Sequence, residues 1–403
     1  MKKRVAIVVA LVTLATTKVL QSQSENLLRL EQRCIEASGT SELHFTGNIF
    51  YKIYGDNSSG AELWMTDQTL VAHQIDPQIL NHLPSTYLSG NLLAYVDYST
   101  AQNIVVINGN GQRVATLTWK SQWDEPISWT LQRKLVVNNV PSDKPKDYGF
   151  SILTFGNNFL QSSHFGNFPF VNLISSEARP LFIVSPTGEQ VVYDALLLSS
   201  LNQIQPGVVF SKRYPFVDKG ILWHTVNERF ANKVRWSPDG NQLVYTPNLD
   251  PDFFGWSFPY PTEIAVVDAS GQEHMLTNFN QSSIHNDTFY TQYNLAWSPN
   301  GNMVAFWLLE TGSQTREKAD STVSTLHVLN LSEKSVYDLC TVNSLGSLAN
   351  FVWSPDSSML IYSQGGNGGN VTIVNLDKNI DFTLALNAFN VISWLNNSTE
   401  SRY

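Results

Sequence analysis

Two stretches of this sequence combine aromatic rings with charged side chains, a combination that can hold a binding partner. Residues 248–260 read NLDPDFFGWSFPY, and residues 278–293 read NFNQSSIHNDTFYTQY. Buried aromatic anchors with a few polar groups around them are typical of recognition surfaces. The candidate ligand- or partner-binding residues are Asp250, Asp252, Phe254, Trp256, Tyr260, Asp287, Phe289, Tyr290, Tyr293 and Arg316.

A plainer interpretation of the same residues needs no partner. The rings could pack on one another as a lid over the mouth of a channel. The four charged residues could be ordinary loop charges in contact with water, which is where most Asp and Arg side chains lie. The sequence leaves both interpretations open.

No arrangement of reactive side chains predicts catalysis. Residues 255–259 (GWSFP) come nearest to the G-x-S-x-G turn of serine hydrolases, but they lack the second Gly and lie in a Pro-rich stretch. The eight His residues are scattered, and none forms the i, i+4 pair of a helical zinc site. Residues 248–255 lack the spaced ligands and terminal Glu of an EF-hand. We therefore expect no catalytic residues, no metal and no cofactor, although enzyme activity stays open.

The chain has two cysteines, Cys34 and Cys340. If the protein is exported they could form one disulfide, and two separate buried thiols are the alternative. Zinc binding is disfavoured, because structural zinc needs four ligands and neither Cys has a His close to it in the sequence.

The N-terminus predicts export. Lys2, Lys3 and Arg4 precede an apolar run, residues 5–15, which is too short to span a bilayer comfortably. Residues 1–23 are therefore expected to be a signal peptide or an N-terminal anchor, with no further membrane span. We expect a periplasmic, cell-surface or secreted protein. Residues 24–42 would be a helical or extended lead-in, in which Ser24 to Ala37 has the most helical pattern.

Charge excludes one class of partner. The formal net charge is −9, and no basic run follows residue 4. Affinity for nucleic acid depends on clustered Lys and Arg that replace the counterions of phosphate groups. We expect a monomer that binds a protein, peptide or glycan and not a nucleic acid.

An internal repeat predicts the architecture that must position these residues. Residues 236–245 (WSPDGNQLVY), 297–306 (WSPNGNMVAF) and 353–362 (WSPDSSMLIY) share one pattern. Pro followed by Asp or Asn and then Gly or Ser is a tight-turn signal between two strands. Weaker copies of the Trp anchor, or the anchor alone, occur at Tyr87, Trp129, Val184 and Trp394.

The anchors lie between 41 and 61 residues apart, which fits four-stranded propeller blades with insertions. We expect an all-β, seven-bladed propeller over residues 43–403, and six or eight blades are the alternatives. The third strand of the fourth blade is ambiguous between residues 207–212 (GVVFSK) and 220–226 (GILWHTV). Trp394 ends a strand that nothing continues, and Thr46 to Gly55 begins without a first strand. The two chain ends should therefore share one blade, which closes the ring.

The strings WSPDGNQLVY and EIAVVDASGQ (residues 263–272) resemble the WD-like repeat of TolB-type β-propellers, which also occurs in prolyl oligopeptidase relatives. The resemblance is strongest over residues 231–394. It implies an exported scaffold that binds partners rather than a hydrolase, because no further domain is evident.

In a propeller, the connections from the second to the third strand and from one blade to the next emerge on one face, and here these are the long ones. Our leading hypothesis is therefore a non-enzymatic binder that uses this long-loop face. The alternative is a hydrolase or lyase with a metal or polar site in the central channel.

Overall fold

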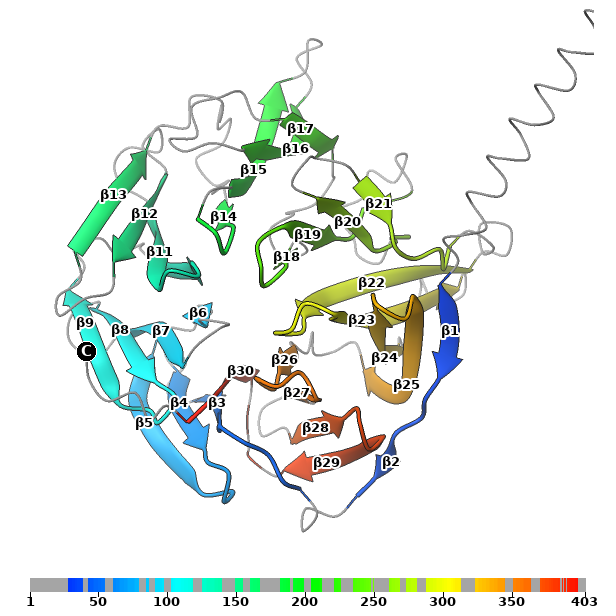
Figure 1. The fold of residues 1–403 in the computed structure, drawn as a ribbon, viewed down its shortest axis with the longest axis horizontal. Helices are drawn as coiled ribbons and strands as arrows, with labels where there is room; N and C mark the ends of the chain where they lie inside the picture. Colours follow the sequence, from blue (N-terminus) through cyan, green and yellow to red (C-terminus); the bar gives the residue numbers. More distant parts are fainter. Residues whose placement is uncertain are drawn as a thin grey trace, which may run out of the picture.

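A computed structural model arranges the strands of this chain as a ring of sheets around a centre (Figure 1). The structure describes residues 28–38, 43–54, 61–79, 85–86, 91–97, 103–118, 125–139, 149–154, 160–166, 182–188, 191–198, 204–211, 221–225, 235–247, 249, 261–268, 273–280, 288–312, 323–344, 351–363, 370–384, 386, 388 and 390–397. Every regular element in these residues is a β-strand, and no helix among them could cross a membrane. The all-β propeller expected from the repeat is confirmed, whereas the segment expected to be a signal peptide or anchor lies outside the described residues.

Three of the six sheets have four strands each. Their strands are β10 (Glu125–Trp129), β11 (Lys134–Asn139), β12 (Gly149–Thr154) and β13 (Leu160–Gly166); β14 (Phe182–Val184), β15 (Val191–Leu198), β16 (Ile204–Ser211) and β17 (Ile221–Thr225); and β18 (Arg235–Trp236), β19 (Gln242–Tyr245), β20 (Ala265–Asp268) and β21 (Glu273–Met275). The ambiguous fourth unit is thereby resolved, since residues 207–211 belong to its third strand and residues 221–225 form its fourth.

Two sheets have five strands because each gains one from the N-terminal segment. The first joins β1 (Arg29–Gln32) to β22 (Thr288–Trp297), β23 (Met303–Gly312), β24 (Val323–Asn330) and β25 (Ser335–Ser344). The second joins β2 (Glu36–Ala37) to β26 (Phe351–Trp353), β27 (Met359–Ser363), β28 (Val371–Asn375) and β29 (Ile380–Leu384).

The expected seven-bladed ring is wrong, because the structure has six sheets. The strands of the first two expected blades belong to one eight-stranded sheet. They are β3 (Asn48–Tyr54), β4 (Ala61–Thr66), β5 (Ala72–Ile79), β6 (Ser85–Thr86), β7 (Leu92–Asp97), β8 (Asn103–Asn108), β9 (Arg113–Thr118) and β30 (Asn390–Leu395). The two groups of strands meet where Ile79 of β5 pairs with Asp97 of β7.

An ionic cluster between two buried carboxylates and a half-exposed guanidinium explains why these two groups of strands stay joined. Arg113 of β9 lies 2.9 Å from a carboxylate oxygen of Asp76 in β5 and 3.5 Å from one of Asp97 in β7. The Tyr95 hydroxyl donates a further hydrogen bond to Asp76 over 2.9 Å. Asp76 and Asp97 are buried, so each needs these partners to offset the loss of hydration. One guanidinium thus holds β5, β7 and β9 in a single sheet.

The repeated Ser-Pro turn owes its sequence to one set of hydrogen bonds. In three copies the Ser hydroxyl accepts a bond from the backbone N–H five residues later, at Gln242, Met303 and Met359, over 2.9–3.0 Å. The same hydroxyl donates to the Asp or Asn two residues on, over 2.5–2.7 Å. Gly240 and Gly301 take positive φ angles of 73°, which favour glycine. The motif therefore encodes a connection between the two innermost strands of a sheet.

The aromatic anchors fill the seams between neighbouring sheets, as the repeat predicts. Trp297 packs on Val244 and Ile264 of the preceding sheet, and Trp353 packs on Leu326 and Tyr293. Each indole N–H also crosses its seam: Trp297 donates to the Arg235 carbonyl over 3.1 Å, and Trp353 donates to the Ala296 carbonyl over 3.0 Å. One side chain therefore supplies both apolar burial and a hydrogen bond between sheets.

The two ends of the propeller share one sheet, as expected. β30 pairs antiparallel with β3, so that Ile49 faces Trp394. The Trp394 indole donates to the Thr46 carbonyl over 2.8 Å, and the ring stacks edge to face with Phe45 at 5.4 Å. Closure by pairing removes two strand edges that would otherwise be free to bind other chains.

The N-terminal strap, residues 28–38, closes the ring a second time along its outer edge (Figure 1). β1 pairs in parallel with β25, and β2 pairs in parallel with β29 of the next sheet. The helix expected between Ser24 and Ala37 is therefore wrong for the described residues. Pairing with two sheet edges satisfies the backbone groups of this segment, and a surface helix would leave both edges uncovered.

A disulfide locks the strap between its two strands. Cys34 and Cys340 are bonded over 2.05 Å, with 4.8 Å between their Cα atoms. Cys340 lies at an irregularity of β25, where one residue of β24 opposes three of β25, and it has a φ of 55°. Bulges of this kind redirect a side chain out of the sheet. The bulge therefore turns the Cys340 sulfur toward the strap.

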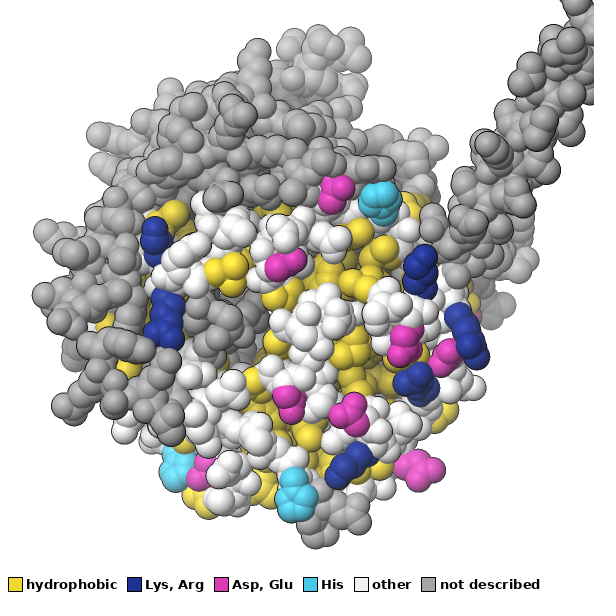
Figure 2. Space-filling model, viewed as in Figure 1, with side chains coloured by type: hydrophobic (Ala, Val, Ile, Leu, Met, Phe, Trp, Pro, Cys, Tyr) yellow, Lys and Arg dark blue, Asp and Glu magenta, His cyan; other side chains and the backbone are white. Residues whose placement is uncertain are grey.

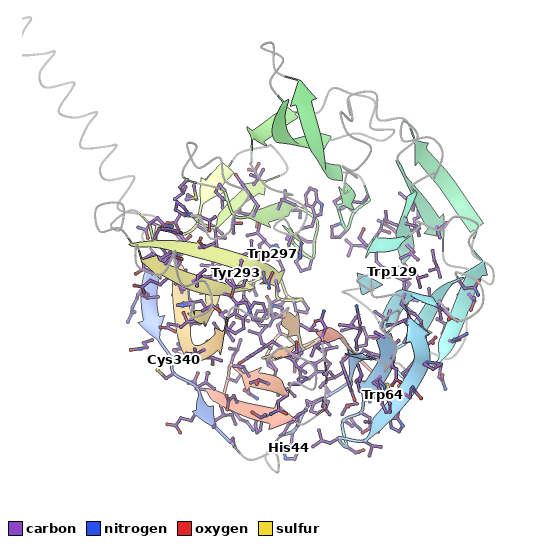
Figure 3. The ribbon with its side chains drawn as sticks, turned by 180° about the vertical axis from the view of Figure 1, so that it is seen from behind. His44, Trp64, Trp129, Tyr293, Trp297 and Cys340 are labelled. Atoms are coloured by element: carbon purple, nitrogen blue, oxygen red, sulfur yellow. A yellow bond between two sulfur atoms is a disulfide. The ribbon has the colours of Figure 1, made fainter. Side chains whose placement is uncertain are left out.

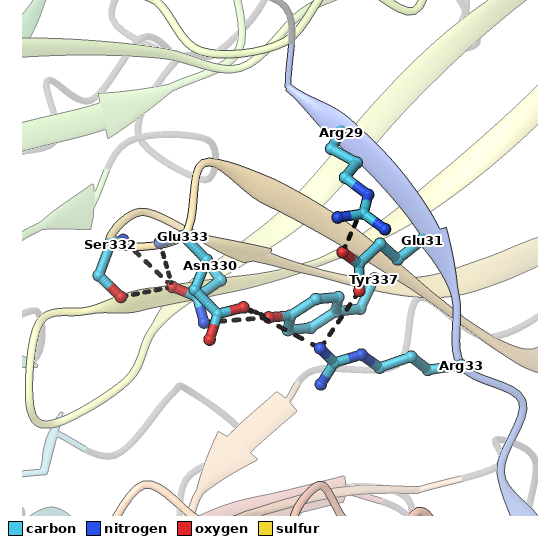
Figure 4. A network of polar contacts seen from close by, with 7 residues as sticks. All are labelled: Arg29, Glu31, Arg33, Asn330, Ser332, Glu333 and Tyr337. Atoms are coloured by element: carbon cyan, nitrogen blue, oxygen red, sulfur yellow. Dashed lines mark hydrogen bonds and ion pairs between the residues drawn. The ribbon is translucent and has the colours of Figure 1, made fainter.

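Polar contacts also join the strap to β25 (Figure 4). The Arg33 guanidinium lies 3.6 Å from the centre of the Tyr337 ring, in a cation–π contact. Arg33 and Arg29 both contact Glu31, over 3.3 and 3.2 Å. The Tyr337 hydroxyl donates to Glu333, so the ring beneath Arg33 is itself held in place.

Removing the disulfide should loosen the ring. The bond connects residues 306 positions apart, and replacing both Cys34 and Cys340 with Ser should lower the free energy of unfolding by roughly 2–5 kcal/mol. The measurement is urea denaturation of both proteins. Wild-type protein unfolded in a reducing agent is the control and should match the variant. Equal midpoints for the oxidised wild type and the variant would contradict a stabilising role.

Candidate functional site

The described structure contains the base of the two aromatic stretches. The first lies between β19 and β20 and the second between β21 and β22. We call the group Thr262, Glu263, Thr277, Asn280, Tyr290 and Gln292 the insertion root, because its members lie within or next to the ends of the two stretches. Leu249 closes the first stretch by donating its N–H to the Pro261 carbonyl over 3.0 Å. Figure 3 labels Tyr293 and Trp297, which belong to β22 like Tyr290 and Gln292.

Asn280 is the centre of the insertion root. Its side-chain amide donates to the Thr262 carbonyl over 2.6 Å and to the Tyr290 carbonyl over 2.9 Å, while its oxygen accepts from the Tyr290 N–H over 2.7 Å. The Thr262 N–H also donates to the Tyr290 carbonyl. The end of the first stretch is thereby joined to both ends of the second. Asn280 is 1% exposed.

Glu263 fixes the segment that precedes Asn280. Its carboxylate accepts from the Thr277 hydroxyl over 2.5 Å and from the Asn280 N–H over 2.6 Å. Burial raises the pKa of Glu263, and these hydrogen bonds oppose the rise without cancelling it. Thr262 adds a bond to the Gln292 amide oxygen over 2.8 Å and accepts the Gln292 N–H. The Glu263 carboxylate therefore uses its oxygens to hold Thr277 and Asn280 in place, which is a positioning role.

An aromatic layer lies directly below the insertion root. The Phe279 ring contacts Tyr290, Phe306 and His327, with ring centres 6.1–6.2 Å apart. His327 stacks on Phe306 at 5.5 Å, and its Nε2 lies 2.8 Å from the Thr325 hydroxyl. Burial lowers the pKa of His327 to about 4, although Asp338 at 3.9 Å acts in the opposite direction. The layer therefore holds a neutral imidazole at pH 7.

Only three of the ten candidate residues fall within the described structure. Tyr293 is buried, and its hydroxyl donates to Ser324 over 2.8 Å, which makes it a core residue. Phe289 and Tyr290 are partly buried on β22, and burial raises the pKa of Tyr290, with a contribution from Glu310. The other seven lie outside the described residues: Asp250, Asp252, Phe254, Trp256, Tyr260, Asp287 and Arg316.

This arrangement can position an interaction surface. The polar members of the insertion root use their hydrogen bonds to fix backbone, and no group of three His, Cys, Asp or Glu side chains among the described residues is placed to hold a metal ion. Sequence reasoning found the stretches but missed Glu263 and Asn280. A signal was present, because both flank the aromatic stretches and buried carboxylates and amides must be paired.

Comparison with known proteins supports the β-propeller fold. A prolyl endopeptidase structure matches with a TM-score of 0.52 and 12% identity, over 85% of this chain and 48% of that one. A puromycin hydrolase matches with a TM-score of 0.51 and 12% identity, over 88% and 53%. This chain therefore spans about half the length of those two proteins. The periplasmic gluconolactonase of Pseudomonas aeruginosa gives a TM-score of 0.49 and 12% identity, over 88% and 98%.

The sequence comparisons are narrower. Residues 288–400 match the family model of eukaryotic translation initiation factor eIF2A, which is less than half of the chain. This segment runs from β22 to the end of β30 and contains two of the three strong repeats. A search of curated proteins finds no match. These findings support a β-propeller and do not single out the TolB type.

Replacing Asn280 with Ala should destabilise the insertion root. The change leaves the Thr262 carbonyl and the Tyr290 N–H without this partner, whereas the Tyr290 carbonyl keeps its bond from the Thr262 N–H, and unpaired buried groups cost about 1–3 kcal/mol each. We expect the free energy of unfolding to fall by roughly 2–4 kcal/mol in urea denaturation. The exposed Asn302→Ala is the matched control and should change it by less than about 0.5 kcal/mol. Similar small losses of stability in both variants would contradict a stabilising role for the hydrogen bonds of Asn280.

His327 should make the fold sensitive to mild acid. Its pKa is near 6.5 in the unfolded chain and about 4 in the folded one, so the unfolded state gains a proton first as the pH falls through this window. Between pH 7 and pH 5 the wild type should lose roughly 1–2 kcal/mol more stability than His327→Phe. Urea denaturation at both pH values measures this difference. Parallel losses in the two proteins would show that His327 is not the responsible group.

Proposed function

We propose that this chain is an exported β-propeller that binds a protein, peptide or glycan partner on the face from which residues 248–260 and 281–287 emerge. One observation carries the proposal: the Asn280 amide bonds to both Thr262 and Tyr290, so the two aromatic stretches share one buried base. Two loops with a common rigid base can present their rings as one surface, which lowers the ordering cost of binding.

Two further observations support export and binding. The Cys34–Cys340 disulfide suits an oxidising compartment outside the cytosol. The resemblance of the repeats to TolB-type propellers favours a scaffold that binds partners. The described residues of the face in Figure 2 carry scattered cationic and anionic side chains and no broad patch of either sign. Aromatic contact is accordingly the main source of affinity in this proposal.

Affinity capture with the full exported chain tests the proposal. The bait is wild type, Trp256→Ala, Tyr290→Ala or Asn280→Ala, and captured species are identified by mass spectrometry. The first two variants remove rings, while the third disturbs the base of both stretches. We expect all three to lose the same species, with affinity for the purified partner at least tenfold weaker.

A surface variant far from the stretches provides the control. Leu131 is exposed on the turn between β10 and β11, and Leu131→Ala should retain the captured species. The competing hypothesis is an enzyme that uses the central channel. Turnover of an ester, lactone, glycoside or peptide by wild type, abolished in a variant of the aromatic stretches, would overturn the proposal. Stoichiometric metal in the purified protein would favour the enzyme.

A further inference from the structure

The seam where the ring closes differs from the other seams. Elsewhere the Ser-Pro turn of one sheet contacts the turn of its neighbour. The Leu131 N–H donates to the Pro186 carbonyl over 2.6 Å, and the Asn300 N–H donates to the Ser357 hydroxyl over 3.1 Å. A Cβ atom on Gly240 would lie 3.0 Å from the Thr187 side chain, so those turns touch as well. At these seams adjacent turns cover the gap between the sheets.

No such turn exists at the closing seam, because β30 and β3 come from opposite ends of the chain. Residues 43–47 precede β3, and His44, Phe45 and Thr46 lie beside Trp394 and the turn that contains Asp356. A pocket of about 160 Å³ remains between His44, Phe45 and Thr46 on one side and the turn that contains Asp356 on the other. Topology, rather than loose packing, therefore creates this pocket.

One wall of the pocket carries a held carboxylate. Oδ1 of Asp356 accepts from the Ser354 hydroxyl over 2.6 Å and from the Ser358 N–H and hydroxyl over 3.0 and 2.8 Å. Burial acts to raise the pKa of Asp356, but these hydrogen bonds lower it by more. The pKa is therefore below its usual value, and the carboxyl group is ionised at neutral pH. The three bonds from Ser354 and Ser358 all go to Oδ1, so Oδ2 takes part in none of them. The negative charge is thus fixed in position with one oxygen available.

The opposite wall adds two more polar groups and an apolar floor. His44 and Thr46 are exposed, and no described residue forms a hydrogen bond with either side chain. The Thr46 carbonyl accepts the Trp394 indole N–H, which fixes this wall in place. Met359 and Trp394, both largely buried, line the pocket beside these groups. The pocket therefore combines one anion, two uncommitted polar groups and a small apolar surface.

We propose that this pocket binds a small primary ammonium compound, such as a short amino alcohol. The ammonium group donates to Asp356 Oδ2, and the hydroxyl of the ligand bonds to His44 or Thr46. The carbon chain packs on Met359 and Trp394. The volume equals about five waters at ~30 Å³ each, which limits the ligand to a few non-hydrogen atoms. This site lies at the Ser-Pro turns and is independent of the aromatic stretches and of the proposed function.

Binding of ethanolamine to the full chain tests the proposal, by NMR titration at constant ionic strength. Ethylene glycol has the same size without the charge, and choline has a charge without an N–H donor. We expect ethanolamine to bind at least tenfold more tightly than either. Equal or absent binding of all three would overturn the proposal.

Substitutions locate the site. Asp356→Asn keeps an acceptor for Ser354 and Ser358 but removes the charge, and it should weaken ethanolamine binding at least tenfold. Thr46→Val is a second variant that leaves the turn unchanged, and it should weaken binding severalfold. Asp239→Asn is the matched control, since Asp239 accepts the same bonds from Ser237 and Asn241 in a turn whose Gly240 contacts Thr187. An equal loss in Asp239→Asn and Asp356→Asn would contradict this site, as would unchanged binding in Asp356→Asn.

Discussion

Each sheet of this propeller can bury its faces only against its two neighbours, so every seam depends on the ring being closed. The Trp anchors show how strongly the seams are built, because each fills the gap and donates a hydrogen bond to backbone across it. An open ring would expose the faces of its first and last sheets. Two devices prevent this: β30 pairs with β3, and the N-terminal strap joins the outer edges of the two sheets that follow the insertion root. The disulfide fixes the strap between its two strands.

The sequence predicts the local features of this fold well, because they arise from residues close together in the chain. The Ser-Pro turn recurs because its Ser hydroxyl makes two hydrogen bonds, and both partners belong to the same motif. The meeting of Trp394 with the start of the propeller followed from two incomplete repeats. The eight-stranded sheet was not predictable in this way. It depends on Arg113 reaching Asp76 and Asp97, a contact between three strands that no repeat encodes.

The strap is a second feature that the sequence alone does not predict. Residues 28–38 have no alternation typical of a strand, because their structure comes from the open edges of β25 and β29 rather than from their own pattern. The pairing of Cys34 with Cys340 likewise depends on a bulge 306 residues away. For the candidate site, the sequence located the aromatic stretches. Their buried base became evident only from the structure, which shows the hydrogen-bond partners of Glu263 and Asn280. The sequence also does not reveal that Tyr293 is buried, with its hydroxyl bonded to Ser324.

The strap also has a consequence for the order in which this protein is made. Its partners, β25 and β29, are synthesised some three hundred residues after it, so the strap is made long before it can pair with them. Contacts of such long range form slowly, and unpaired edges attract other chains while they wait. The nascent chain must therefore keep this segment unattached until the final sheets have folded. Because the chain has only two cysteines, the Cys34 thiol must stay unpaired until Cys340 is in place.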